Sequence, residues 1–359
     1  MWVTLMMMLL LCKHSPFTAL RRKFFSTTST KGTELASFAS SRSAFTPTVM
    51  DAFIHRVKEN NVVDLSDCEW GAHVPFICEG IKYGYLKNDF AEKLGIEFPD
   101  TFKLVRGTVS TKKVTFSENV EKMSVEGRTA AVLDVCKLLR NKGKIRGWRN
   151  EMLPVLTSFS SEPAFLIERA AYPIFGVRGY GVHVNGYVCK DPSSGVPSHL
   201  WVARRSKSKS TWPSMLDHIV AGAQPFDISP SENVIKECGE EANIDESLAK
   251  TARPVGAVSY QGSDEDGNLK RDTLFCFDLE LPIDFVPTPV DGEVESFELQ
   301  PIDWVVDKLV EGGSAGYKPN CNLVIIDFLI RHGIVPADAN RYLELVGLLR
   351  SNGINDSCC

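Results

Sequence analysis

Apolar and polar residues alternate most clearly in the second half of the chain, where their pattern predicts two pairs of strands. Residues Tyr180–Cys189 and Leu200–Arg204 alternate or run apolar, and a loop rich in Pro, Ser and Gly separates them. Arg253–Tyr260 and Thr273–Leu281 form a second pair around the turn-rich segment Gly262–Gly267. This part of the chain is therefore expected to build a sheet.

A helix is predicted between the two strand pairs, over Pro230–Ala242, after a loop over Ala221–Ile228. Ser229 is suited to be the N-cap, and Glu232 completes an S-x-x-E capping box with it. Asn243 follows the last turn, where an asparagine tolerates the left-handed conformation that ends many helices. Both ends of this helix are thus specified by local sequence.

The segment 51–172 contains short elements without a regular alternation of strand and helix. We expect helices over Met50–Glu59 and Glu126–Leu139, a helical turn at Asp89–Leu94, two strands within Val74–Leu86 and one at Lys113–Ser117. Such an order favours an α+β domain. Two amphipathic helices, Asn320–Ile334 and Ala337–Arg350, are expected to close the chain.

The first fifty residues differ in composition from the rest. They contain six Lys and Arg against the single acid Glu34, and they are rich in Ser and Thr, which is typical of an organelle transit peptide. Met1–Cys12 is apolar, but no basic region precedes it and it is too short to span a bilayer. We expect a plastid transit peptide over 1–50. A mitochondrial address or a disordered cytoplasmic extension is the alternative.

Composition and charge narrow the class of protein. The 359 residues are 43% hydrophobic and 24% charged, which excludes a disordered, collagen-like or multispan membrane protein and leaves room for two domains. A formal net charge of −5 gives no global attraction for nucleic acid. The ten cysteines include no C-x-x-C pair, so neither a disulfide framework nor a zinc site is expected. No membrane partner is expected, and the oligomeric state stays open.

Three glutamates on the predicted helix are the strongest chemical signal. Glu237, Glu240 and Glu241 are spaced i, i+3 and i+4, which places them on one face of a helix. Their carboxylates repel one another unless a cation lies among them, and Mg²⁺ or Mn²⁺ suits oxygen ligands. The alternative is a solvated acidic face.

The surrounding residues resemble a known motif. From Gly222 the sequence reads G-A-Q-P-F-D-I-S-P-S-E-N-V-I-K-E-C-G-E-E-A-N-I, which resembles the Nudix box G-x5-E-x7-R-E-U-x-E-E-x-G-U, where U is a bulky apolar residue. Three positions depart from the box. Ile228 stands where the box has its first glutamate, Lys236 replaces the arginine, and Asn243 replaces the closing glycine. The lysine keeps the charge of the arginine but loses its two-pronged guanidinium.

The resemblance extends beyond the box. The stretches Tyr180–Tyr187, Leu200–Ser206 and Thr211–Gly222 look like plant chloroplastic Nudix hydrolases that carry an upstream thiamin-pyrophosphokinase-related domain, although Ala223 stands where that family has a second glycine. The resemblance implies an α/β protein: a Nudix α/β/α sandwich with a mixed sheet over 173–335, preceded by an N-terminal α+β domain over 51–172. Residues 336–359 would form a C-terminal helix and tail.

The resemblance also implies an activity. It implies Mg²⁺-dependent or Mn²⁺-dependent hydrolysis of a diphosphate linked to another moiety, with thiamin diphosphate and its oxidised analogues as the family-implied substrates. Nucleoside diphosphate derivatives are the generic alternative. The extra N-terminal domain would then supply selectivity, with an aromatic surface such as Trp148, Trp201 or Trp212 against the rings of the substrate.

Candidate site residues follow from these expectations. Glu237, Glu240 and Glu241 are the candidate metal ligands, and Glu237, Glu293 and Glu295 are the candidate acceptors of the water proton. Arg204 and Arg205 are the candidate diphosphate ligands, because guanidinium groups match phosphate oxygens well. The alternative interpretation of Arg204 and Arg205 is a solvated basic loop. For Glu293 and Glu295 it is a charged surface loop.

Three other interpretations stay open. The segment Gly312–Gly316 matches the hydrolase elbow G-x-S-x-G, but a helix-like stretch precedes it, so we interpret it as a loop. The stretch before the box is also reminiscent of isopentenyl diphosphate isomerases, which release no phosphate. Ile228 and Ala223 leave room for a diphosphate-binding module without catalysis.

Overall fold

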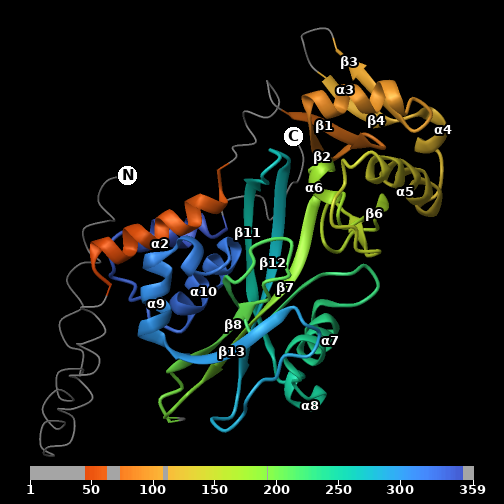
Figure 1. The fold of residues 1–359 in the computed structure, drawn as a ribbon. Helices are drawn as coiled ribbons and strands as arrows, with labels where there is room; N and C mark the ends of the chain where they lie inside the picture. The colour runs from red at the N-terminus through yellow and green to blue at the C-terminus, as the bar shows by residue number, and fades with distance from the viewer. Residues whose placement is uncertain (1–44, 63–72, 108–111, 192, 351–359) are drawn as a thin grey trace, which may run out of the picture. The chain divides into compact units, whose positions relative to one another are not determined.

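The computed structural model describes residues 45–62, 73–107, 112–191 and 193–350 (Figure 1). The predicted transit peptide 1–50 lies outside these ranges except for its last six residues. Within the described ranges, no helix combines the length and the apolar composition needed to cross a bilayer.

A seven-stranded mixed sheet forms the centre of the second half of the chain. Its strands are β7 (Arg178–Val188), β8 (His199–Arg205), β9 (Leu216–Asp217), β10 (Val220–Ala223), β11 (Arg253–Ser263), β12 (Leu269–Glu280) and β13 (Val294–Pro301). The order is β11-β12-β7-β8-β13, with β10 paired to β7 and β9 to β8. β12 runs parallel to β7 and the other pairs are antiparallel. The four predicted strands and the mixed sheet are confirmed.

Helices cover both faces of this sheet, as Figure 1 shows. On one face, α7 (Pro230–Ala242) and α8 (Glu246–Ala249) pack on apolar residues such as Val182, Val184 and Phe277. On the other face, α9 (Ile302–Glu311) and α10 (Pro319–Arg331) pack on a separate core that includes Leu274 and Cys276. Alternate residues of β7 and β12 thus point into different cores, and the expected α/β fold with an α/β/α sandwich is confirmed.

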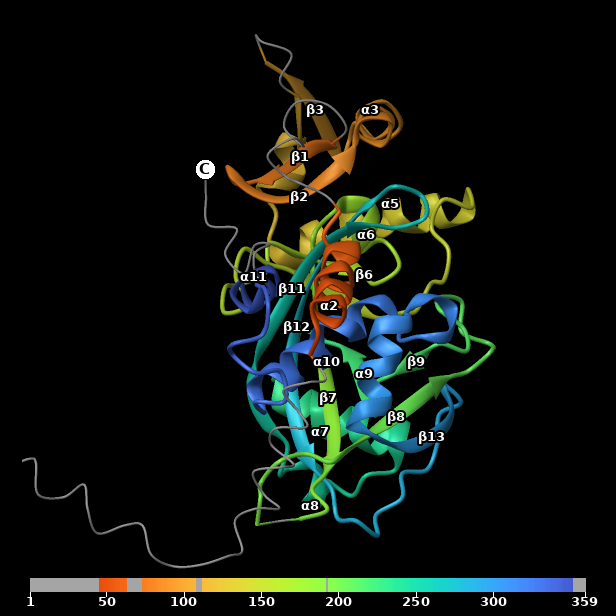
Figure 2. The same ribbon diagram turned by 90° about the vertical axis from the view of Figure 1, so that its left-hand side faces the viewer.

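The helix α2 (Pro47–Asn60) belongs to this sandwich and not to the segment that follows it. Its apolar residues Met50, Phe53, Ile54 and Val57 are buried in the same core as α9 and α10, and Figure 2 shows the helix alongside them. A boundary after residue 50 would cut the helix in its first turns. Sequence pattern predicted the helix, but it could not show which core the apolar face joins.

The strand β10 corrects a second expectation, because the predicted loop Ala221–Ile228 begins as a strand. Ala221, Gly222 and Ala223 pair antiparallel with Val182 and its neighbours on β7. A run of Ala and Gly has little intrinsic preference for a strand. The pairing therefore comes from the central strand beside it and not from local sequence.

The first half of the chain has a hydrophobic core of its own. A four-stranded sheet of order β2-β1-β4-β3 is formed by β1 (His73–Cys78), β2 (Ile81–Lys87), β3 (Phe102–Arg106) and β4 (Lys112–Phe116). Around it lie α3 (Asn88–Glu97), α4 (Glu118–Glu121), α5 (Val125–Asn141), α6 (Tyr172–Phe175) and the pair β5 (Met152–Val155) and β6 (Phe165–Glu168). The ring of Phe76 packs edge-on against four other phenylalanines of this core. The α+β character is as expected, whereas β3 was not predicted.

The C-terminal elements differ from expectation mainly in length. A single 3₁₀ turn, η1 (Gly313–Ala315), connects α9 to α10, so the G-x-S-x-G match is a loop between helices, as interpreted. The last helix, α11 (Tyr342–Leu348), is shorter than the predicted Ala337–Arg350. Arg341 before it has a left-handed backbone with φ of 60°, which a continuous helix cannot contain.

Candidate active site

The capping predicted for α7 is present and fixes the start and end of the helix. Ser229 Oγ accepts a hydrogen bond from the Glu232 backbone N at 3.2 Å, and Glu232 Oε2 accepts one from the Ser229 backbone N at 2.8 Å. Asn243 ends the helix in the left-handed conformation, with φ of 52°. Because both ends are specified, the register of the helix over the sheet is specified too.

The three box glutamates have different surroundings. Glu241 is buried, and its Oε2 accepts a hydrogen bond from the Ala221 backbone N of β10 at 2.9 Å. Glu237 is mostly buried, at 15% side-chain exposure, and lies against Gly222. The Glu240 carboxylate is 54% exposed and forms an ion pair with Lys236 at 2.7 Å. Their shared helix face therefore does not place all three carboxylates together.

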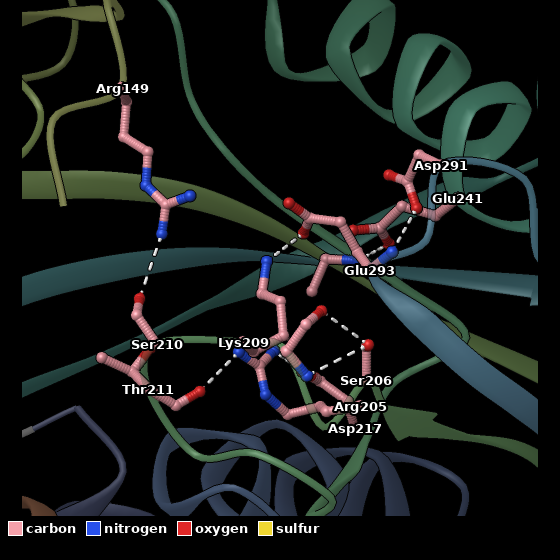
Figure 3. Close-up of polar contacts among 12 residues, drawn as sticks. Arg149, Arg205, Ser206, Lys209, Ser210, Thr211, Asp217, Glu241, Asp291 and Glu293 are labelled. Atoms are coloured by element: carbon pink, nitrogen blue, oxygen red, sulfur yellow. Dashed lines mark hydrogen bonds and ion pairs between the residues drawn. The ribbon is translucent and has the colours of Figure 1, made fainter.

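The structure gathers a different set of three carboxylates. One oxygen each of Glu241, Asp291 and Glu293 lies within 4.8 Å of the others, a spacing at which one cation can touch all three (Figure 3). Asp291 and Glu293 come from the segment that leads into β13, and the Glu293 backbone N donates to Asp291 Oδ1 at 2.8 Å. Glu293 was a sequence candidate, but Asp291 was not. Its place two residues earlier in the same acidic run is the signal that could have found it.

The electrostatics of the cluster favour a bound cation. Burial raises the pKa of the Glu241 carboxyl well above its usual value, and the nearby carboxylates of Asp217, Glu237 and Glu293 raise it further. Burial also raises the pKa of Glu237. A group of mutually repelling carboxylates, of which Glu241 is buried, is the chemistry that a hard divalent ion satisfies. The residues present therefore fit a divalent metal.

Glu295 lies apart from the cluster. Its carboxylate forms an ion pair with Lys207 at 3.2 Å on the exposed side of β13. The register between β13 and β8 shifts between Val294 and Ser296, so Glu295 is the additional residue of a β-bulge. A bulge reverses the side on which a residue emerges, which a count of strand positions from sequence does not reveal.

The two candidate arginines hold a loop. Arg205 donates to the Trp212 and Thr211 carbonyl oxygens at 2.9 Å each and to Asp217 Oδ2 at 2.7 Å (Figure 3). Arg204 donates to the Ser214 carbonyl oxygen at 3.0 Å. Arg205 still lines the neighbouring cavity, whereas Arg204 does not.

That cavity, of about 200 Å³, opens beside the acidic cluster and is strongly basic. Six basic side chains line it: Arg149, Arg169, Arg205, Lys209, Lys270 and Lys318. Glu293 belongs both to the cavity wall and to the acidic cluster, and it forms an ion pair with Lys209. Ala221 and Gly222 of β10 also line the cavity, and they contact Glu241 and Glu237 respectively. A negatively charged ligand in this cavity would therefore lie next to a metal held by the cluster.

Both halves of the chain contribute to the cavity. Arg149 and Arg169 come from the first half, and Figure 3 shows Arg149 reaching Ser210, to whose Oγ it donates at 3.4 Å. Of the three candidate tryptophans only Trp212 lines the cavity. Trp148 packs on the core of the first half beneath Arg140, and Trp201 is buried under α7. Sequence analysis missed Arg169, which becomes a cavity residue only through folding.

A second group of metal-ligand types lies beneath the cavity. Donor atoms of His183, Asp217, His218 and Cys321 lie within 4.8 Å of one another. Their contacts are already made: Cys321 Sγ donates to Asp217 Oδ1 at 2.9 Å, and the Nδ1 atoms of the two histidines are 3.0 Å apart. Arg205 and Lys318 neutralise the carboxylate from its other side. A further buried positive charge here would be unfavourable, so we interpret the group as a polar support for the cavity.

Comparison with known proteins gives the following likenesses. Residues 52–179 match a family described as "Domain of unknown function (DUF4743)". The chain is 47% identical over 283 residues to "Nudix hydrolase 20, chloroplastic" of Arabidopsis thaliana, with 78% of this chain and 74% of that protein covered. It is 46% identical over 281 residues to "Nudix hydrolase 24, chloroplastic" of the same plant, with 78% and 73% covered.

The solved structures that the chain matches have lower sequence identity. A MutT protein from Methanosarcina mazei is 18% identical, with 43% of this chain and 92% of that chain covered and a TM-score of 0.30. A C. elegans Ap4A hydrolase is 13% identical, with 43% and 98% covered and the same TM-score of 0.30.

Proposed function

Because this chain belongs to the Nudix hydrolases, enzymes that act on phosphorus-containing anhydrides, we propose that it hydrolyses an organic diphosphate in the basic cavity with Mg²⁺ or Mn²⁺ as cofactor. The observation that carries the proposal is the shared position of Glu293, which belongs to the basic cavity and to the carboxylate cluster. The basic cavity, which suits an anion, and the carboxylate cluster, which suits a cation, thus share the side chain of Glu293. This is the arrangement that metal-assisted cleavage of a phosphoanhydride needs.

The residues divide into a binding set and a metal set. Arg149, Arg169 and Lys209 bind and neutralise the phosphate oxygens, since a diphosphate is the ligand that matches such a wall. Glu241, Asp291 and Glu293 would hold the ion. Glu240 would become a further ligand only if its ion pair with Lys236 were broken. When bound, a divalent ion supplies charge neutralisation and lowers the pKa of a bound water.

Glu237 is the favoured acceptor of the water proton. It is mostly buried beside Gly222 at the edge of the cavity, and burial raises its pKa, which makes its carboxylate a better base. Burial would raise the pKa of Glu293 as well, but the ion pair with Lys209 outweighs burial and lowers it. Glu293 is therefore the weaker base, and Glu295 lies on the exposed side of β13.

The loop that lacks the first box glutamate is held by amide groups. The Gln224 side chain donates to the Ile228 carbonyl oxygen at 2.6 Å, and Asn233 donates to the Ala223 carbonyl oxygen at 2.8 Å. These contacts keep the loop closed against α7 without the missing carboxylate. The names of the relatives favour hydrolysis over isomerisation and over binding alone.

We propose thiamin-type diphosphates as the preferred substrates. Every organic diphosphate offers the same phosphate groups, so selectivity must come from the wall around the other end. The first half of the chain supplies Tyr172 and Leu153 to that wall, and Tyr180 and Trp212 add aromatic surface. The relatives named chloroplastic, together with the basic and hydroxyl-rich N-terminus, support a plastid location.

The substrate proposal is tested by steady-state kinetics. The full chain is assayed with Mg²⁺ on thiamin diphosphate, its oxidised analogues, a nucleoside diphosphate and a nucleotide sugar. We expect release of a monophosphate, with kcat/KM at least about tenfold higher for the thiamin-type compounds. Equal kcat/KM values across the panel would contradict the substrate preference and leave the hydrolase assignment intact.

A further inference from the structure

One residue of the cavity does not suit a phosphate ligand. Six of the lining side chains are basic and two are acidic, Glu293 and Asp272. Glu293 belongs to the carboxylate cluster, whereas Asp272 is not among the described residues of that cluster. Asp272 is only 7% exposed. A buried carboxylate repels phosphate, so Asp272 needs a different partner within the ligand.

Two phenols fix the Asp272 carboxylate in position. Tyr172 Oη donates to Oδ1 at 3.1 Å, and Tyr260 Oη donates to Oδ2. Burial raises the pKa of both phenols well above the usual value, so both remain donors at neutral pH. Each carboxylate oxygen has two lone-pair positions, and each phenol uses one. The carboxylate therefore keeps acceptor capacity, in the presence of the positive charges of Lys270, whose Nζ lies 3.8 Å from Oδ2, and of Arg178.

The strand beside Asp272 contributes two glycines to the cavity wall. Gly179 pairs with Asp272 across β7 and β12, and Gly181 pairs with Leu274 two positions further on. A Cβ at Gly179 would lie 2.5 Å from Asp272 Oδ1 and 3.1 Å from the Tyr172 ring. Asp272 Oδ1 and the Tyr172 ring therefore occupy the space that a side chain at position 179 would take, and the Gly222 carbonyl oxygen lies over Gly181. Tyr180 and Trp212 add aromatic surface to the same cavity.

We propose that Asp272 determines specificity by accepting a hydrogen bond from a ring-borne amino group, so that this part of the cavity takes an amino-substituted nitrogen heterocycle of the aminopyrimidine type. The ring takes the part of the cavity beside Asp272, and its diphosphate lies among the basic side chains. The inference rests on the proposed function and narrows it, because the basic wall accepts any diphosphate whereas Asp272 selects those whose other end donates. A ring without a donor would exclude water from the carboxylate and leave its remaining acceptor positions unused, which is unfavourable.

Equilibrium binding tests the proposal without requiring turnover. An aminopyrimidinylmethyl diphosphate and benzyl diphosphate have rings of the same size and the same diphosphate, but only the first carries an amino donor. Each is titrated into the full chain by calorimetry in EDTA. We expect the aminopyrimidine compound to bind at least about tenfold more tightly. Equal dissociation constants in the unsubstituted protein would overturn the proposal.

A variant locates the effect. Asp272→Asn should weaken the aminopyrimidine compound at least about tenfold and leave benzyl diphosphate unchanged or tighter, because a carboxylate that repels phosphate has gone. Asp266→Asn, an exposed aspartate in the β11–β12 hairpin, is the matched control and should change neither. An equal loss for both ligands would show a merely structural Asp272 and overturn the proposal. Absence of hydrolysis across the substrate panel would instead contradict the proposed function, since these titrations do not depend on it.

Discussion

At the scale of single residues, the box glutamates show what a helical spacing does and does not determine. The spacing correctly placed Glu241 toward the sheet, where its carboxylate meets the Ala221 backbone N. It could not show that Asp291 and Glu293, fifty residues later, complete the cluster. Arg205 illustrates the same limit: sequence identifies a guanidinium near the box, but only the fold shows its three donors already in use.

Glu241→Gln tests the metal cluster. The variant removes a charge from the proposed ion site, so we expect kcat to fall at least about 10²-fold. Thermal stability should hold or rise, because one of several repelling carboxylates has gone. Glu246→Gln on α8, whose carboxylate is 70% exposed, is the matched control and should leave kcat unchanged. Unaltered turnover in Glu241→Gln would remove Glu241 from the metal site.

At the scale of elements, the bounds of α7 could be predicted to the residue, whereas the strand β10 beside it could not be predicted. The boundaries of α7 follow from its capping box and from Asn243, which are local signals. β10 depends on pairing with β7, and its Ala-Gly-Ala sequence carries no strand preference of its own. The bulge that turns Glu295 outward is likewise a property of the β8–β13 pair. Long-range pairing is thus where local pattern fails.

Gly222→Ala tests the contact between β10 and α7. A Cβ at this position would overlap the Glu237 carboxyl group, so the variant should displace the proposed base and lower kcat at least about tenfold. Gly239→Ala on α7 is the control, because a Cβ there meets open space. It should keep kcat and raise stability by about 0.5–1 kcal/mol, since alanine favours a helix over glycine. Comparable kinetics of the two variants would contradict the role of Gly222.

Asp278 links β12 to the end of α10 and gives the fold a pH dependence. Its carboxylate accepts from Arg331 Nη1 and Nη2 at 2.5 and 3.0 Å, from Asn185 at 3.0 Å, and contacts His332 Nε2 at 2.9 Å. Burial would raise the pKa of Asp278, but His332 and Arg331 outweigh burial and lower it to about 2. Its stabilisation is therefore present above about pH 4 and is lost as the pH falls toward 2.

Urea unfolding at several pH values checks this link. Asp278→Asn leaves Arg331 with a weaker partner, so we expect a loss of about 3 kcal/mol at pH 7 and a smaller difference from the unsubstituted chain at pH 3. Asp284→Asn, an exposed aspartate of the following loop, should change neither. A loss that stays the same at both pH values would show that the charge of Asp278 contributes nothing to stability.

At the scale of the whole molecule, α2 ties the start of the described chain to the catalytic half. Sequence composition separated residues 1–50 from the rest, but the helix crosses that boundary and its apolar face completes the core under α10. A test of the N-terminal domain by deletion of residues 51–170 would therefore remove most of α2, and with it part of the sandwich, along with the core of the first half. A cleaner test of the first half keeps α2.

Phe53→Ala tests how much α2 contributes. The ring is fully buried, and its loss should lower the free energy of unfolding by about 3–5 kcal/mol. His55→Ala, on the opposite side of the helix with a 63% exposed side chain, should change it by less than about 0.5 kcal/mol. Equal effects of the two variants in thermal or urea unfolding would mean that α2 does not belong to the core.

Import should leave α2 intact. We expect the transit peptide to be removed in the plastid with the mature N-terminus before Pro47, because cleavage after residue 50 would expose the partners of Met50 and Phe53. Mass spectrometry of the protein isolated from plastids measures the position. A mature chain that retains Met1, or one that begins after Pro47, would contradict this prediction.

If the basic cavity and the carboxylate cluster together hydrolyse a phosphoanhydride, ³¹P NMR will detect the reaction. The chain from Phe45 onward is incubated with thiamin diphosphate, first in EDTA and then with Mg²⁺. We predict that the two anhydride resonances persist in EDTA and, after Mg²⁺ is added, give way to the signals of thiamin monophosphate and inorganic phosphate. Anhydride resonances that persist with Mg²⁺, for thiamin diphosphate and for every other organic diphosphate tried, would contradict the account.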